Sequence, residues 1–224
     1  MTVLAAYYDT NYVGFLSDVE VAAVPPRESF KIQYSEDLSI VYAIVGDELA
    51  INVINTLLMW NSIAAIQSKI QLDQLPFIQE VTRAMTHLAR TSKSYAPQYR
   101  DTNIYIFSGQ RLFMWRVSAI ASQKLFSPLQ GLPMTLPPNQ IHFDWFGNRS
   151  SKPTTVPSSE SDLRSILETQ ILNEDQVWRS NLAPNSQVPP LLNGRFTTVI
   201  SSTNGNKLIS HPYVSFFDMI SRFV

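Results

Sequence analysis

Hydrophobic and polar residues are arranged along the chain in runs that predict short strands separated by turns. Residues 3–18 are expected to form a hairpin, because the apolar run VLAAYY is followed by the turn residues DTNY and then by VGFLSD. A second hairpin is expected over residues 29–46, where SFKIQY and LSIVYAIVG flank the turn SED. The last of these strands is apolar on both faces, which indicates a strand that is covered on both sides.

From Asp47 the spacing of apolar residues changes to the period of an α-helix. Asp47 is a favourable N-cap, and apolar residues recur along one face as far as Ile66. A second amphipathic helix is expected from about Phe77 to Arg90, and a third over residues 159–178. The inward-facing residues of the second helix are expected to be Ile78, Val81, Met85 and Leu88.

Two further hairpins are expected in the second half of the chain. TNIYIFSGQRLFMWRVS turns at Gly109-Gln110, and GRFTTVISS is joined to KLIS by TNGN, which contains the Asn-Gly turn signal. Between them, residues 119–159 are rich in Pro, Ser and Asn and flank one short aromatic strand, IHFDWF. This stretch is expected to be an irregular insert, and the third helix that follows it would be capped by Ser159 or Ser161.

Strands that are segregated from helices in this order indicate the α+β class. We expect a four-layer α/β/β/α sandwich, in which two antiparallel sheets are stacked between helices. No shift in composition divides the chain, so residues 1–224 are expected to form a single domain.

Composition excludes several classes of function. The formal net charge is -1, and no cluster of Lys or Arg gives the electrostatic pattern of a nucleic-acid-binding protein. The absence of Cys excludes disulfides, thiol catalysis and zinc–thiolate sites. No apolar run is long enough for a membrane span and no signal peptide is seen, so we expect no membrane partner and a location in the cytoplasm, or in a particle assembled there.

The common enzyme motifs are also missing from the sequence. It contains no GxSxG, HExxH, Walker loop or GxGxxG, and no cofactor is expected. His142 and Asp144 lie two residues apart and would project from one side of a strand. Two ligands do not make a metal site, so they are interpreted as an ordinary hydrogen-bonded pair and no metal is expected.

Four short motifs in a fixed order carry a resemblance to a known family. The opening MTVLAAYY, then GFLSD, FKI and IVGDELA, resemble the proteasome beta-subunit-like and bacterial proteasome-related branch of the N-terminal-nucleophile (Ntn) hydrolases. The two helices that follow and IYIFSGQRLFMWRVS fall in the same order, so the resemblance extends from residue 2 to about 118. It implies the Ntn type of sandwich and assembly into a homo-oligomer.

The chemistry of such a site centres on a threonine at the chain start. A hydroxyl is a weak nucleophile until a base takes its proton, and a free α-amine, with an ordinary pKa of about 7.7 to 8.0, suits that role near neutrality. A neighbouring lysine keeps the amine neutral, and a carboxylate holds the lysine. By the resemblance, the nucleophile and base is Thr2, the carboxylate Asp18, the lysine Lys31, and the oxyanion donor the backbone N–H of Gly46.

Two functions remain open from the sequence. In the first, Met1 is removed and the protein is a threonine peptidase or amidase that acts on peptide substrates within an assembly. In the second, the fold is catalytically silent and serves as a structural subunit of a larger assembly such as a virion. The second is favoured by Val19 and Glu20, which replace the family's basic residue and turn glycine, and by the lack of a counterpart to its glycine-serine and serine-glycine-glycine segments. A retained Met1 would also convert the required amine into an amide.

Overall fold

A computed structural model gives the architecture of the chain. The described residues are 3–18, 20–21, 27–28, 31–35, 40–47, 49–54, 56–57, 75–91, 101–129, 133–145, 148–181, 195–202 and 208–215. The chain divides into two compact units, one of Met1–Ile32 with Pro138–Val224 and the other of Gln33–Pro137. The single domain expected from the sequence stays a prediction.

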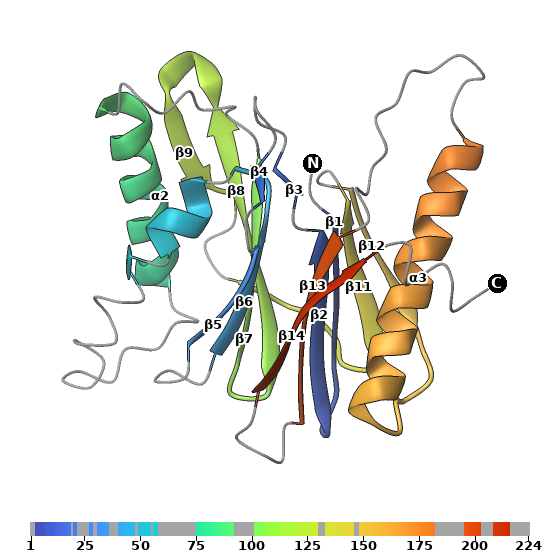
Figure 1. The fold of residues 1–224 in the computed structure, drawn as a ribbon. Helices are drawn as coiled ribbons and strands as arrows, with labels where there is room; N and C mark the ends of the chain where they lie inside the picture. The colour runs from blue at the N-terminus through green and yellow to red at the C-terminus, as the bar shows by residue number, and fades with distance from the viewer. Residues whose placement is uncertain are drawn as a thin grey trace. The chain divides into compact units, whose positions relative to one another are not determined.

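The first unit contains a six-stranded antiparallel sheet in the order β12-β11-β1-β2-β13-β14 (Figure 1). The helix α3 (Glu160–Ser180) lies along one face of this sheet. A separate two-stranded ladder is formed by β3 (Glu20–Val21) and β4 (Arg27–Glu28). The strands of the large sheet are β1 (Val3–Tyr8), β2 (Tyr12–Asp18), β11 (Gln140–Trp145), β12 (Asn148–Pro153), β13 (Arg195–Ser202) and β14 (Leu208–Ser215).

The turn between β1 and β2 is organised by the carboxylate of Asp9. Its Oδ1 accepts hydrogen bonds from the backbone N–H groups of Asn11 and Tyr12, at 2.6 and 2.7 Å, and its Oδ2 accepts one from the Tyr7 hydroxyl at 2.6 Å. Asp is favoured in turns because its side chain satisfies backbone donors in this way. The predicted hairpin over residues 3–18 is confirmed.

Close packing of α3 on the sheet depends on Gly14 of β2. A Cβ at this position would lie 2.8 Å from Leu163 Cδ2 and 3.0 Å from Leu167 Cδ1, so a larger residue would force these leucine side chains to shift. An apolar cluster between α3 and the sheet consists of Val3, Ala5, Tyr7, Leu16, Ile141, Phe143, Leu163, Leu167, Ile171 and Ile200.

The start of α3 is capped by the side chains of Ser159 and Asp162. The Ser159 hydroxyl accepts the Asp162 N–H at 3.1 Å, and the Asp162 carboxylate accepts the Ser158 N–H at 2.7 Å. Of the two caps that the sequence allows, Ser159 is therefore the one used.

The second unit contains an antiparallel sheet in the order β10-β8-β7-β6-β5, with β9 also paired to β8. Two helices pack on one face: α2 (Leu75–Thr91) and a helix described over residues 49–54 and 56–57. Every residue of β6 is buried, which confirms the prediction of a strand covered on both sides. The strands are β5 (Ile32–Ser35), β6 (Ile40–Val45), β7 (Thr102–Ser108), β8 (Arg111–Ile120), β9 (Leu125–Pro128) and β10 (Met134–Thr135).

The buried face of α2 follows the predicted helical period, with one exception. Ile78, Val81 and Met85 are fully buried and pack in one cluster with Trp115 of β8. Leu88 was expected to face inward but is 38% exposed, and the next residue, Ala89, is buried in its place. A helix advances 100° per residue, so eleven residues make about three full turns. Ala89, eleven residues after Ile78, therefore faces the same way as Ile78, and Leu88 lies to one side.

The β7–β8 turn is as predicted, at Gly109 and Gln110, with positive φ values of 56° and 62° that are typical of a type I′ hairpin. Residues 119–159 contain more regular structure than their composition indicates. They include the 3₁₀ turn η1 (Ala121–Gln123) and the strands β9 to β12, two of which belong to the large sheet of the first unit. His211, expected at a loop end, lies within β14, an edge strand that tolerates the adjacent Pro212.

The α+β class with two antiparallel sheets is confirmed. Within the described ranges, no helix combines the length and the apolar character needed to cross a membrane.

Candidate active site at the start of β1

The first strand begins beside the carboxylate that ends the second. In the β1–β2 ladder Leu4 pairs with Ser17, so Val3 and Asp18 lie at the same end of the hairpin. The Val3 backbone N–H donates a hydrogen bond to Asp18 Oδ1 at 2.7 Å. Asp18 thus fixes the backbone of the residue that directly follows Thr2.

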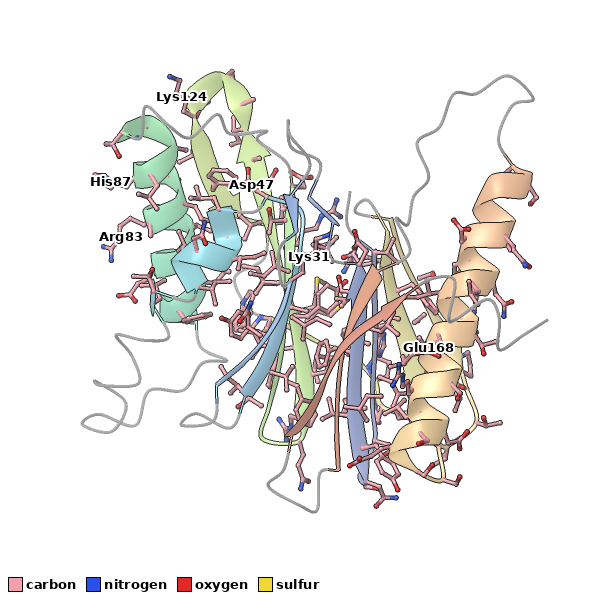
Figure 2. All side chains as sticks on the ribbon, in the orientation of Figure 1. Lys31, Asp47, Arg83, His87, Lys124 and Glu168 are labelled. Carbon is pink, nitrogen blue, oxygen red and sulfur yellow. The ribbon has the colours of Figure 1, made fainter. Side chains whose placement is uncertain are left out.

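The other oxygen of Asp18 binds Lys31, which lies immediately before β5 (Figure 2). The distance from Lys31 Nζ to Asp18 Oδ2 is 2.6 Å, and the two side chains are only 4% and 3% exposed. A lysine side chain is usually exposed to solvent, but here the Lys31 ammonium is buried beside the Asp18 carboxylate. The sequence-predicted carboxylate and lysine are therefore brought together.

Burial and charge act in opposite directions on Asp18. Removal from water raises the pKa of its carboxyl above the usual value, while the Lys31 charge and the hydrogen bonds from Lys31 and Val3 lower it. Burial has the larger effect, so the pKa of Asp18 is raised overall. The pair is held together because each charge would be costly without the other.

The structure does not test the roles of the two remaining residues of the predicted set. Thr2 lies outside the described residues. Gly46 belongs to the second unit and has a φ of 133°, and a Cβ there would lie 2.4 Å from the Asp101 carbonyl oxygen. Glycine is therefore required at this strand-to-helix connection for conformational reasons. Its predicted role as oxyanion donor stays a prediction.

The residue after Gly46 confirms the predicted start of a helix. Asp47 Oδ1 accepts the Leu49 N–H at 3.0 Å, which is the geometry of an N-cap. The Asp47 N–H in turn donates to the Thr102 hydroxyl at 2.9 Å. This bond joins the start of the helix to the first residue of β7.

Polar residues that the sequence analysis did not assign to the site also lie near the start of β1. Ser17 and Asp144 are each 1% exposed, and both are paired with Leu4, Ser17 from β2 and Asp144 from β11. The signal that could have found them is the strand register, which links distant segments and is not contained in the local pattern. No group of three or more His, Asp or Glu side chains that could hold a metal occurs among the residues that the structure describes.

Comparison with known proteins identifies the fold. No protein-family model matches the chain, and no curated protein matches it in sequence. Solved structures do match it, and they show that this chain shares its fold with the protein Anbu.

Two of these structures are of the protein Anbu. One is the Anbu (Gly-1) mutant from Hyphomicrobium sp. strain MC1, which is 13% identical, with a TM-score of 0.52 over 100% of this chain and 93% of that one. Another is Anbu, described as an ancestral beta-subunit, from Yersinia bercovieri, which is 11% identical, with a TM-score of 0.51 over 100% of this chain and 92% of that one. The resemblance drawn from the sequence is confirmed at the level of the fold.

Proposed function

We propose that this protein is a threonine-type peptidase or amidase that uses Thr2 as its nucleophile after removal of Met1. The observation that carries the proposal is the buried Lys31–Asp18 ion pair beside the backbone N–H of Val3. Asp18 serves as the carboxylate that holds both the lysine and the start of β1. Lys31 supplies the positive charge.

Each member of the site has a defined task in the proposed reaction. The free α-amine of Thr2 takes the proton of its own hydroxyl, and the oxygen attacks the carbonyl carbon of a peptide or amide substrate. The Lys31 ammonium keeps the amine neutral by repulsion and stabilises the alkoxide as it forms. The Gly46 N–H donates to the oxyanion of the tetrahedral intermediate. The C–N bond of the substrate then breaks, the leaving amine takes the proton held by the Thr2 amine, and the acyl group remains on the Thr2 oxygen. Water, deprotonated by the same amine, then hydrolyses this ester and restores Thr2.

The proposal includes the quaternary arrangement. We infer a four-layer α/β/β/α sandwich and self-assembly into a homo-oligomer. The support is the fold likeness to Anbu, one example of which is described as an ancestral beta-subunit.

The test of the catalytic part combines intact mass with hydrolysis of peptide reporters. Protein lacking Met1 is compared with Thr2→Ala, which removes the hydroxyl, and with Thr2→Ser, which keeps one. We expect the wild type and Thr2→Ser to cleave the reporters and Thr2→Ala to fall to background. Cleavage by Thr2→Ala at the wild-type rate would exclude Thr2 as the nucleophile.

The second candidate is a catalytically silent subunit of a larger assembly. It is favoured by the substitution of Val19 and Glu20 for the residues that the family usually has after its aspartate. Sedimentation analysis of the same proteins separates the two candidates. A silent subunit assembles equally well as wild type and as Thr2→Ala, retains Met1, and shows no reporter cleavage that depends on Thr2.

A further inference from the structure

The backbone around Gly46 is held by Thr102, the first residue of β7. The N–H that follows Gly46 belongs to Asp47, and it donates to the Thr102 hydroxyl at 2.9 Å. A Cβ on Gly46 would lie 2.7 Å from Thr102 Cα and 2.8 Å from Thr102 Oγ1, so the two segments are in close contact. Asp47 and Thr102 are 4% and 0% exposed, so the hydrogen bond between them is shielded from water. Thr102 therefore fixes the peptide group between Gly46 and Asp47.

Thr102 is itself held in place from β8, through the residue that precedes it. The Asp101 carboxylate accepts hydrogen bonds from the Ala119 N–H at 3.0 Å and from the Ser118 hydroxyl at 3.2 Å. The backbone carbonyl oxygen of Asp101 is the atom that lies 2.4 Å from the Cβ position of Gly46. The start of β7 is therefore anchored on one side to β8 and supports Gly46 on the other.

Such support matters for a backbone group that acts as an oxyanion donor. The donor is effective when its direction is fixed before the reaction, because no reorganisation is then needed as the charge forms. Glycine has the widest range of backbone conformations, so a glycine fixes its own direction least. The φ of 133° at Gly46 also lies in a region that other residues rarely adopt. A donor at this position needs neighbours that hold the backbone in place.

We propose that Thr102 is a positioning residue of the threonine site: by accepting the Asp47 N–H, its hydroxyl holds the Gly46 backbone in the conformation that directs the Gly46 N–H at the oxyanion. Asp101 supports Thr102 through its hydrogen bonds to β8. The inference rests on the proposed function, which assigns the oxyanion donor to Gly46. Thr102 acts only through Gly46 and neither gives nor takes a proton in the reaction.

The test removes the hydroxyl that accepts the Asp47 N–H. Thr102→Val has nearly the same shape and lacks the acceptor, whereas Thr102→Ser keeps it. The matched control is Thr86→Val, because the Thr86 hydroxyl on α2 accepts the Phe126 N–H of β9, also at 2.9 Å, and Thr86 is buried too. The two valine variants therefore remove the same kind of hydrogen bond from the same unit.

Activity is measured with a peptide reporter in protein lacking Met1. In Thr102→Val, kcat should fall by about tenfold to 100-fold while KM is retained, since displacement of a catalytic group by about 1 Å can cost about 100-fold in rate. Thr102→Ser should recover most of kcat. Thr86→Val should lose stability as Thr102→Val does, but should keep the wild-type kcat. A folded Thr102→Val with the wild-type kcat, or an equal fall of kcat in Thr86→Val, overturns the inference.

Hydrogen exchange of the backbone amides, read by NMR, separates this inference from the proposed function. The Asp47 amide should exchange at least about tenfold faster in Thr102→Val than in the wild type, because it loses its buried acceptor. If hydrolysis depends on Thr2 but Thr102→Val changes neither kcat nor this exchange, the role of Thr102 is refuted and the proposed function stands.

The converse result separates the two ideas in the other direction. If no hydrolysis depends on Thr2 but the Asp47 amide still exchanges faster in Thr102→Val, the peptidase proposal fails and the support of Gly46 by Thr102 stands. If Thr102→Val does not fold by circular dichroism, Thr102→Ala is measured in its place. Exchange of the Asp47 amide at the wild-type rate in a folded variant without the hydroxyl overturns the inference.

Discussion

The Lys31 ammonium lies 2.6 Å from the Asp18 carboxylate, and neither side chain is more than 4% exposed. The free energy needed to remove two charges from water often exceeds the free energy gained from their attraction. A buried pair of this kind is therefore weak evidence for a purely stabilising role. Its position beside Val3, the residue after Thr2, is the basis of the catalytic role that we propose for it.

Loss of one partner of this pair should be strongly destabilising. Lys31→Met leaves the Asp18 charge buried without its partner, and we expect the free energy of unfolding to fall by about 3–5 kcal/mol in urea at neutral pH. The double variant Lys31→Met/Asp18→Asn should recover most of this loss, because Asn is neutral and still accepts the Val3 N–H.

An exposed ion pair provides the control for that measurement. Arg83 and Glu80 on α2 are 3.8 Å apart, with side chains that are 80% and 47% exposed. Arg83→Met should change stability by no more than about 0.5 kcal/mol. Equal effects of the Arg83 and Lys31 substitutions would contradict the burial of the Lys31–Asp18 pair.

The protonation of Asp18 should set a characteristic pH dependence. Its pKa is raised in the folded state, so the folded protein binds this proton more tightly than the unfolded chain, in which the pKa of Asp is about 3.9. The stability that this proton contributes is present at low pH and is lost as the pH rises from the unfolded value through the folded value.

We therefore expect a ¹³C-carboxyl titration of Asp18 with a midpoint above about 3.9. Over the same window, the stability of the wild type relative to Asp18→Asn should fall with rising pH and then level off. Lys31→Met should move the midpoint higher still, because the Lys31 charge lowers the pKa. A relative stability that rises with pH over this window would show that the ion pair outweighs burial.

Gly46 should not tolerate a side chain. Gly46→Ala combines a positive φ with a Cβ 2.4 Å from the Asp101 carbonyl oxygen, so we expect a loss of more than about 3 kcal/mol, or failure to fold. Gly109 is the matched control, since its φ of 56° is also positive but no atom lies within 4 Å of an added Cβ. Gly109→Ala should cost about 1–2 kcal/mol by chemical denaturation. Similar costs at the two glycines would argue against the close approach of Gly46 to the backbone of Asp101 and Thr102.

The cap of α3 gives a test with two neighbouring serines. Ser159→Ala removes the acceptor of the Asp162 N–H and should lower the free energy of unfolding by about 1 kcal/mol. Ser161→Ala, in the exposed first turn, should stay within about 0.5 kcal/mol of wild type. A larger effect at Ser161 than at Ser159 would show that the helix starts elsewhere.

Much of the fold is encoded in local patterns, which is why it could be predicted. The hairpin at Asp9, the turn at Gly109, and the caps at Asp47 and Ser159 each depend on residues close together in sequence. The structure of residues 119–159 was harder to predict, because their strands are short and pair with strands far away in the sequence. One example is β11, which pairs with β1. Composition rich in Pro and Ser gave no sign of those partners.

Part of the candidate site could also be predicted from the sequence. Asp18 and Lys31 were found by motif order, and the geometry brings them together. Asp144 was interpreted as one member of an ordinary hydrogen-bonded pair with His142, and only the register of β11 against β1 reveals that it lies opposite Leu4. Side-chain neighbours across a sheet follow from pairing, which a single sequence does not specify.

The most direct measurement is the site of acylation by a peptide ester in protein lacking Met1, read by mass spectrometry of the intact chain and of its N-terminal peptide. The account predicts one acyl group on residue 2 of the wild type, none on Thr2→Ala, and much slower acylation of a folded Lys31→Met variant. Acylation at other residues only, or acylation of Thr2 that is unaffected by loss of Lys31, would contradict it.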